Sequence, residues 1–247
     1  MSTKRIFTGE IIGTFILVFI GCGSVSLAII YEIINSLFEV ALFWTLGVIL
    51  GIYCSSKLSG AHLNPAVSIA MLTEKKIKLS EFFYYLIAQF IGALIAGFIL
   101  FKLIKNDIEV YDLKTACIFG EYFPNPTFEN LDWVSLPIAC FIEILATFSL
   151  VYLIFIITNI SKIKKLSPTL IGLSVGIIIY IVAPYTQCCM NPARDIAPRI
   201  IAHLNGWEQF TFNHNGIGWL VVYILAPLIG GVLGALTFKL TLKNRIS

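Results

Sequence analysis

Two copies of the tripeptide Asn-Pro-Ala are the residues of this sequence best suited to contact a solute. They are Asn64, Pro65 and Ala66, and Asn191, Pro192 and Ala193. Asparagine is a favoured N-cap and proline a favoured first helical residue, so each copy predicts the start of a helix. The N–H groups at a helix start are free and lie at the positive end of the helix dipole. Both helix starts, with the two side-chain amides, are therefore expected to donate hydrogen bonds to a neutral polar solute.

Each copy lies in a segment that is neither a membrane span nor an ordinary loop. The two segments, residues 59–71 and 187–199, open with small or polar residues and then continue as a helix. That helix is expected to have about two turns, too short to cross a bilayer. The chain before each Asn is irregular, and its unpaired carbonyls are tolerated by a water-filled lumen but not by lipid. The segments therefore predict a pore; the alternative is that each Asn merely caps a re-entrant turn.

Three charged residues accompany these segments. Glu10 and Glu143 lie deep in apolar stretches, where an ionisable residue usually has a function. We expect each to accept hydrogen bonds from N–H groups of the irregular segment in its own half; for Glu10 the alternative is an interfacial charge without a partner. Arg194 is expected to be the one fixed cation of the lumen and to repel cations and protons. The alternative for Arg194 is a side chain that snorkels to the interface.

No set of residues indicates catalysis or a bound cofactor. The sequence has no recognisable acid–base pair, nucleophile triad or phosphate-binding loop, so we do not expect an enzyme. The cysteines show no CxxC spacing, and neither a disulfide framework, a metal site nor a cofactor is expected. They are Cys22, Cys54, Cys117, Cys140, Cys188 and Cys189.

The composition shows which elements position these residues. Of 247 residues, 58% are apolar and 13% charged, whereas soluble domains have about 45–50% and about 25%. These values exclude a disordered chain, a soluble enzyme and a nucleic-acid-binding module, because so small a domain cannot hide that much apolar surface. A bilayer span needs about 20 apolar residues. Six stretches qualify, namely residues 6–30, 38–56, 81–104, 133–158, 168–186 and 218–240.

The basic residues predict the orientation of the spans. Twelve of the 17 lie on the side that holds both termini, and Lys102, Lys105 and Lys114 lie on the other. The positive-inside rule therefore places both termini in the cytoplasm of a multi-pass protein of a plasma or inner membrane. The twelve are Lys4, Arg5, Lys57, Lys75, Lys76, Lys78, Lys162, Lys164, Lys165, Lys239, Lys243 and Arg245.

The two halves of the chain resemble each other. Three motifs recur in the same order, pairing residues 10–18 with 143–151, 63–66 with 190–193, and 88–92 with 226–230. We expect one transmembrane channel domain, residues 1–247, built from repeats at about 6–104 and 133–243. Each repeat has three spans, so the second is inverted and the two Asn-Pro-Ala segments meet near the midplane.

These motifs resemble the major intrinsic protein family, the aquaporins and aquaglyceroporins. The most specific residues are 59–67, Ser-Gly-Ala-His-Leu-Asn-Pro-Ala-Val, and 190–195, Met-Asn-Pro-Ala-Arg-Asp. The resemblance covers essentially the whole chain. It implies an all-α membrane protein with six transmembrane helices and two re-entrant half-helices, one pore per subunit, and a homotetramer.

Several residues are closer to the glycerol-conducting branch of that family. These are Asp195, Arg199, Pro227 and Leu228, with the loop residues 123–126, Phe-Pro-Asn-Pro. Asp195 and Arg199 are four residues apart on the short helix and are expected to pair and hold the outer loop open. Two solvated helix charges are the alternative. His62 is expected to line the vestibule on the cytoplasmic side.

The resemblance also implies a selectivity filter. Counting from the Asn residues places it at Trp44, Ile179, Cys188 and Arg194. Glycerol facilitators typically have a Gly and a large aromatic residue at the second and third of these positions, and water-selective members have a His and often a Cys. The sequence departs from both patterns, and the missing His argues against a narrow water filter. Trp44 and Ile179 are expected to form an apolar corner beside Arg194.

The expected function is passive diffusion of glycerol and other small neutral polar solutes together with water, with exclusion of ions and protons. The expected partners are these solutes, the lipid bilayer and further copies of the chain, without nucleic acid. The main alternative is an aquaporin that conducts mostly water. Two further alternatives are a secondary transporter and a structural membrane protein with a closed pore. A transporter would need a buried carboxylate at a coupling-ion site.

Overall fold

A computed structural model describes residues 2–242 and contains, in this part of the chain, six helices long and apolar enough to cross a membrane. Strands are absent from the described residues. Five spans are α1 (Thr3–Ile29), α2 (Leu37–Ser59), α4 (Leu79–Ile104), α6 (Leu136–Asn159) and α7 (Ser167–Thr186). The sixth comprises α10 (Gly218–Leu220), η2 (Val221–Leu225) and α11 (Ala226–Thr241). The predicted six-span fold is confirmed. Lys243, Arg245 and the predicted end of the second repeat at residue 243 lie outside the described residues.

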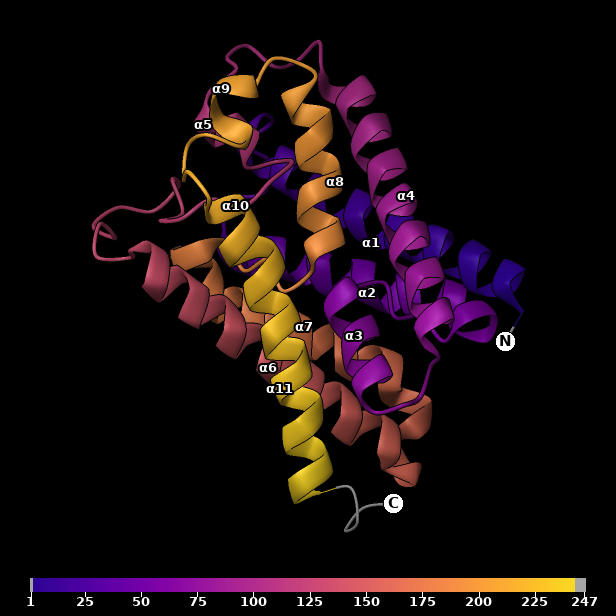
Figure 1. The fold of residues 1–247 in the computed structure, drawn as a ribbon. Helices are drawn as coiled ribbons and strands as arrows, with labels where there is room; N and C mark the ends of the chain where they lie inside the picture. Colours follow the sequence, from indigo (N-terminus) through magenta and orange to yellow (C-terminus); the bar gives the residue numbers. More distant parts are fainter. Residues whose placement is uncertain (1, 243–247) are drawn as a thin grey trace.

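Two further helices follow the Asn-Pro-Ala motifs. They are α3 (Pro65–Thr73) and α8 (Pro192–His203), and Figure 1 shows them within the bundle, α8 between α4 and the sixth span. α3 has 9 residues, as expected, but α8 has 12 and exceeds the predicted two turns because its helical pattern continues beyond residue 199. Short helices occupy the connections, namely α5 (Leu113–Ala116), η1 (Ser161–Leu166) and α9 (Glu208–Thr211).

The sixth span is not a continuous α-helix, which the sequence analysis did not anticipate. Residues Val221–Leu225 form a π turn that ends two residues before Pro227. Proline has no N–H, so Pro227 cannot donate to the carbonyl of Tyr223 four residues earlier. The Tyr223 carbonyl instead accepts a hydrogen bond from the Cys189 thiol, with a sulfur–oxygen distance of 3.6 Å. Pro227 thus frees a backbone acceptor that contacts the second irregular segment.

Glycines allow two pairs of spans to pack in direct backbone contact. A Cβ atom at Gly92 of α4 would lie 2.5 Å from the carbonyl oxygen of Ile11 in α1. A Cβ atom at Gly230 of α11 would lie 2.4 Å from the carbonyl oxygen of Ile144 in α6. The two glycines occupy matching positions of the sequence repeat, and each contacts the residue after a buried glutamate. Only glycine permits this approach, which fixes both glutamates relative to the bundle.

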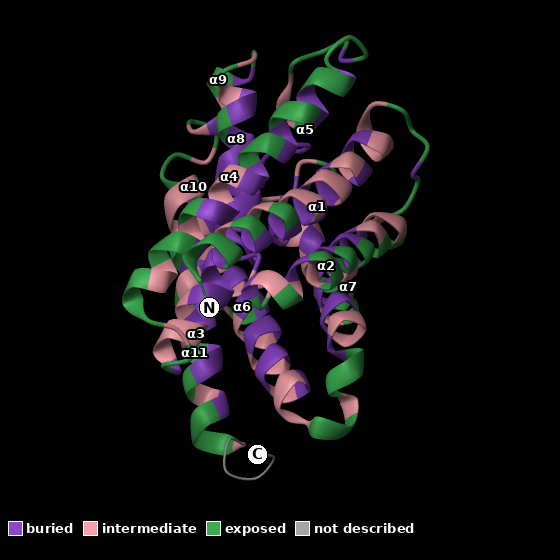
Figure 2. Ribbon diagram, turned by 90° about the vertical axis from the view of Figure 1, so that its right-hand side faces the viewer, coloured by how far each residue is buried: buried purple, intermediate pink, exposed green. Residues whose placement is uncertain are grey.

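The outward faces of the spans suit a lipid environment. Figure 2 shows buried residues along the inward faces of the helices and exposed residues on the outside. Large apolar side chains such as Leu46, Ile87 and Ile177 are exposed on three different spans. An exposed apolar surface on all sides of a bundle is expected where the solvent is hydrocarbon. The chain is a multi-pass membrane protein.

Candidate pore and selectivity filter

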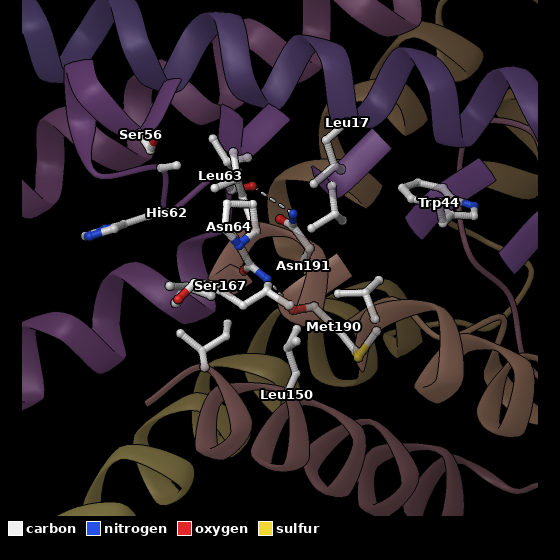
Figure 3. Close-up of a pocket in the computed structure, with 18 of the residues that line it drawn as sticks. Leu17, Trp44, Ser56, His62, Leu63, Asn64, Leu150, Ser167, Met190 and Asn191 are labelled. Carbon is white, nitrogen blue, oxygen red and sulfur yellow. Dashed lines mark hydrogen bonds between the residues drawn. The ribbon is translucent and has the colours of Figure 1, made fainter. Parts of the chain in front are cut away.

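The two irregular segments are joined to each other by their asparagines. The Asn64 Nδ2 donates to the carbonyl of Met190 at 2.8 Å, and the Asn191 Nδ2 donates to the carbonyl of Leu63 at 2.9 Å. Figure 3 shows both asparagines between Leu63 and Met190, with His62 on one side of them and Trp44 on the other. Each amide carries two N–H groups. One is used in the crossed pair of bonds, so one per asparagine is left for a solute.

The asparagine oxygens cap the half-helices. The Asn64 Oδ1 accepts a hydrogen bond from the N–H of Ala66 at 2.7 Å, and the Asn191 Oδ1 accepts one from the N–H of Ala193 at 3.1 Å. Each Asn is therefore the N-cap that the sequence predicted, with Pro65 or Pro192 as the first helical residue. Because the side-chain oxygen of each Asn is bonded to the start of its own half-helix, the side-chain nitrogen points away from that helix.

The backbone before each asparagine has a repeated, unusual conformation. Residues with positive φ occur at three equivalent pairs of positions, namely Gly60 and Gln187, Ala61 and Cys188, and Leu63 and Met190. Five of these six are not glycine, although a left-handed conformation costs such residues of the order of 1–3 kcal/mol. Strained backbone persists only where its surroundings hold it, and it concentrates at functional sites. The buried glutamates supply that support.

Glu10 holds the first segment. Its Oε1 accepts hydrogen bonds from the His62 N–H at 3.0 Å and the Ser59 hydroxyl at 2.5 Å. Its Oε2 accepts from the Leu63 N–H and from the Gln89 Nε2, both at 2.7 Å. Glu10 is fully buried. The alternative of an interfacial charge without a partner is therefore wrong.

Glu143 holds the second segment in a closely similar way. Its Oε1 accepts from the Thr186 hydroxyl at 2.6 Å and the Cys189 N–H at 2.9 Å, and its Oε2 accepts from the Met190 N–H at 3.0 Å. A hydroxyl and two successive N–H groups thus bind each glutamate in both halves. These are the hydrogen bonds predicted from the sequence. Gln89, which adds a fourth donor to Glu10 and also bonds the Ser68 hydroxyl, was not anticipated.

The predicted filter residues border two cavities, and three of them border both. A cavity of about 550 Å³ is bordered by His62, both asparagines and Cys188, and a cavity of about 260 Å³ lies on the side of the 105–135 loop. Four residues border both cavities, namely Trp44, Ile179, Gln187 and Arg194. The structure therefore brings all four predicted filter residues to one region, Cys188 on the larger cavity.

Arg194 lies on the face of Trp44 and forms an ion pair. Its guanidinium carbon is 4.2 Å from the centroid of the Trp44 ring, a cation–π contact. Its Nη1 pairs with Oε1 of Glu121, a buried residue of the 105–135 loop. This pair corrects the expectation of one uncompensated cation in the lumen, because the carboxylate neutralises the guanidinium. The snorkelling alternative for Arg194 also fails, since its side chain is buried beside the two cavities.

Asp195 and Arg199 join α8 to the outer loops. The Arg199 Nη2 lies 2.8 Å from the Asp195 Oδ1, as expected for residues four apart. Asp195 accepts a hydrogen bond from the Glu121 N–H at 2.6 Å, and Arg199 donates to the carbonyls of Thr211 and Glu121. Both residues are buried, so the alternative of solvated helix charges is wrong. Of the other branch markers, Pro227 lies in the first turn of α11, just after the π turn, and Leu228 is half-buried beside it.

His62 and the cysteines complete the lining. The His62 ring stacks on Tyr85 with centroids 4.0 Å apart, and its Nδ1 lies 3.2 Å from the Ser68 hydroxyl. Burial, and to a lesser extent the charge of Lys76, lowers the pKa of His62, so its ring is neutral at pH 7. All six cysteines are free thiols; Cys188 and Cys189 border the larger cavity, and Cys117 borders the smaller one.

Glu121 is the functional candidate that the sequence analysis missed. The neighbouring Pro124 and Asn125 served as branch markers in the sequence, but the acid before them was not singled out. Residues 116–124 read Ala-Cys-Ile-Phe-Gly-Glu-Tyr-Phe-Pro, so Glu121 is the lone charge in an apolar run outside any span. A charged residue in such a run needs a buried partner, so the sequence itself could have singled out Glu121.

Comparisons with known proteins agree with this geometry. Residues 1–238 match the family described as Major intrinsic protein. The chain is 32% identical to "Aquaporin-9" of Mus musculus, over 95% of this chain and 81% of that protein. It is 32% identical to "Glycerol uptake facilitator protein" of Haemophilus influenzae, over 96% of this chain and 94% of that protein. The X-ray structure of the aquaglyceroporin from Plasmodium falciparum superposes with a TM-score of 0.87 at 29% identity, covering 99% of both chains. The chain belongs to the major intrinsic protein family.

Proposed function

We propose that this protein is a passive membrane channel for glycerol and similar small neutral solutes, together with water. The observation that carries this proposal is the pairing of a hydrogen-bond donor with an apolar wall at the filter. The guanidinium carbon of Arg194 lies 4.2 Å from the centroid of the Trp44 ring, and Ile179 borders the same two cavities. A polyol has hydroxyls along one edge and carbon along the other, so both of its sides find a partner there. Relatives named glycerol uptake facilitator support the same solute class.

The central asparagines are proposed to carry the solute between the two half-helices. Asn64 and Asn191 each keep one free N–H, and the positive ends of α3 and α8 meet beside them. Because Glu121 neutralises Arg194, this central potential is the main barrier to cations and protons in the proposal. A neutral solute is not affected by it.

Two alternative functions have weaker support. A channel that conducts mostly water would be expected to have a His at the position of Ile179, where this chain has an apolar side chain that offers no hydrogen bond to water. A secondary transporter needs a buried carboxylate free to bind a coupling ion. Glu10 and Glu143 are poor candidates, since every one of their oxygens already accepts a hydrogen bond.

The setting of the channel in the membrane is also a proposal. The excess of lysine on the side of α3 supports cytoplasmic termini in a plasma or inner membrane. The paired contacts of Glu10 and Glu143 support two inverted repeats within a single domain. A homotetramer with one pore per subunit is proposed from family membership.

Vesicles containing the purified protein test passive transport. Radiolabelled glycerol uptake should rise linearly with glycerol concentration and should not change when ionophores collapse proton and sodium gradients. Uptake that saturates and is abolished by the ionophores would instead identify a coupled transporter.

A further inference from the structure

A chain of buried hydrogen bonds leads from Glu10 to the ring of His62. The Gln89 Nε2 donates to the Glu10 Oε2 at 2.7 Å and to the Ser68 hydroxyl oxygen at 2.9 Å. That hydroxyl oxygen lies 3.2 Å from the Nδ1 of His62. Glu10, Ser68 and Gln89 are all fully buried, so each of their hydrogen-bonding hydrogens needs an acceptor in the protein. The chain of bonds therefore restricts where its hydrogens can lie.

The direction of the chain is set at Glu10. The carboxylate already accepts hydrogen bonds from the irregular segment, so it meets Gln89 as an acceptor, and Gln89 must turn its NH₂ group toward it. The reverse orientation would place the Gln89 oxygen against a carboxylate oxygen. The two N–H groups of Gln89 are then used by Glu10 and Ser68. The Ser68 oxygen thus accepts a hydrogen bond, and its own hydrogen is left to donate.

The tautomer of His62 follows from Ser68. Among the described residues, the His62 Nδ1 is the only other hydrogen-bond partner of this hydroxyl. If Nδ1 carried the hydrogen and donated to Ser68, the Ser68 hydroxyl hydrogen would be buried without an acceptor, which is costly and rare. Nδ1 is therefore the acceptor. A neutral imidazole has one N–H, so the hydrogen lies on Nε2.

The Nε2 of His62 is open to the larger cavity. His62 is half-buried, borders that cavity and lies on the opposite side of the asparagines from Trp44 (Figure 3). Its Nδ1 is bonded to Ser68 and one face of its ring is stacked on Tyr85, so the ring cannot turn freely. Among the described residues, no hydrogen bond reaches Nε2, and this atom is not fully buried. A solute in the cavity can therefore reach the Nε2–H.

We propose that Ser68 and Gln89 are positioning residues that fix the tautomer of His62 and so make its Nε2–H a solute-binding donor. The identity of the solute rests on the proposed function, whereas the tautomer does not. The irregular segment beside His62 carries backbone carbonyls, which only accept hydrogen bonds. A hydroxyl of a polyol both donates and accepts, so a donor next to these carbonyls satisfies it completely. The opposite tautomer would add one more acceptor instead.

The tautomer is tested by nitrogen NMR of the protein, labelled with ¹⁵N-histidine, in lipid vesicles. The chain has three histidines, and His62→Asn identifies the signals of His62. We expect a bare Nδ1 and a protonated Nε2 in the wild-type protein at pH 7. Ser68→Ala should give a mixture of both tautomers, whereas Ser68→Thr keeps a hydroxyl and should keep the wild-type spectrum. Gln89→Met, which frees the Ser68 hydroxyl to turn, should also give a mixture and is measured in case Ser68→Ala fails to insert.

The matched control is Ser24→Ala. It removes another buried hydroxyl, which donates to the carbonyl of Gly21 and lies outside this chain of bonds. The signals of His62 should not change in this variant.

The solute contact is tested by a double-mutant cycle on glycerol permeability, measured by light scattering and divided by the amount of inserted protein. His62→Phe keeps a ring to stack on Tyr85 but removes the donor, and loss of one neutral hydrogen bond corresponds to about a two- to tenfold lower permeability. Ser68→Ala should lower permeability by about twofold at most, if both tautomers become equally populated. In the His62→Phe background Ser68→Ala should have no further effect, because Ser68 acts through the imidazole.

Each part of the proposal can be overturned separately. A hydrogen on Nδ1 in the wild-type protein, or an unchanged spectrum in both Ser68→Ala and Gln89→Met, would overturn the positioning role. Unchanged glycerol permeability in His62→Phe, or an equal loss from Ser68→Ala in both backgrounds, would overturn the solute contact. Failure of the wild-type protein to conduct glycerol would instead overturn the proposed function, while the NMR spectra would still decide the tautomer.

Discussion

Replacement of Glu143 by glutamine tests how the second irregular segment is held. Glu143 accepts three hydrogen bonds, from Thr186, Cys189 and Met190. Glutamine has one acceptor oxygen, so one of its two terminal atoms becomes a donor. The least harmful orientation keeps the two bonds at Oε1 and turns the NH₂ group toward the Met190 N–H, where donor faces donor.

The size of the effect follows from that lost contact. A hydrogen bond to a charged group contributes about 1.5–3 kcal/mol, and a buried N–H without an acceptor adds a further penalty. Met190 has a φ of 51°, so its strained conformation also loses its support. A net loss of about 2 kcal/mol lowers the population of the conducting arrangement by up to about 30-fold. The melting temperature should fall by about 4–8 °C for a chain of this length.

The assay compares thermal unfolding in detergent with glycerol permeability in vesicles. Glu129→Gln makes the same chemical change at an exposed loop position and should match the wild-type protein in both measurements. Unchanged melting and permeability in Glu143→Gln would refute the claim that this carboxylate holds the segment. Because the hydrogen bonds of Glu143 are local, a fall in permeability without global unfolding would still support the claim that Glu143 holds the segment.

Three further predictions follow from the packing, the lining and the charge of the pore. Gly230→Ala should lower the melting temperature, since its Cβ would lie 2.4 Å from a backbone oxygen and overpacking costs about 1–3 kcal/mol, whereas Gly23→Ala meets no atom within 4 Å and should not. A mercurial should block glycerol flux through Cys188, and equal block of Cys188→Ser would show that this thiol does not face the lumen. Because the pKa of His62 is lowered, its ring stays neutral from about pH 5 to 8, and glycerol permeability should be constant there; a step near pH 6.5 that His62→Asn removes would contradict the neutral assignment.

The central site could be predicted because its residues carry local signals. Asn-Pro before a short helix specifies a cap wherever it occurs, so Asn64 and Asn191 needed no tertiary information. Glu10 and Glu143 stood out because a charge within an apolar span requires a partner. Their donors were foreseeable as well, since the irregular segments nearby had N–H groups to satisfy.

Other features depend on contacts between distant segments and were not predictable in this way. Glu121 reaches Arg194 across 73 positions of sequence, through a loop whose path no periodicity reveals. Pro227 was read only as a branch marker, and the thiol bond from Cys189 to the carbonyl of Tyr223 joins residues 34 positions apart. The charge state of the filter, which follows from the Glu121 pair, was accordingly the part of the prediction that failed.

Glycerol permeability of vesicles containing the wild-type protein measures directly whether this chain conducts glycerol. Vesicles with and without protein are mixed with a hyperosmotic glycerol solution, and the rate of reswelling is followed by light scattering. Reswelling well above that of empty vesicles is expected, together with faster initial shrinkage from water flow. Water flow that rises while glycerol reswelling stays at the empty-vesicle rate would contradict it.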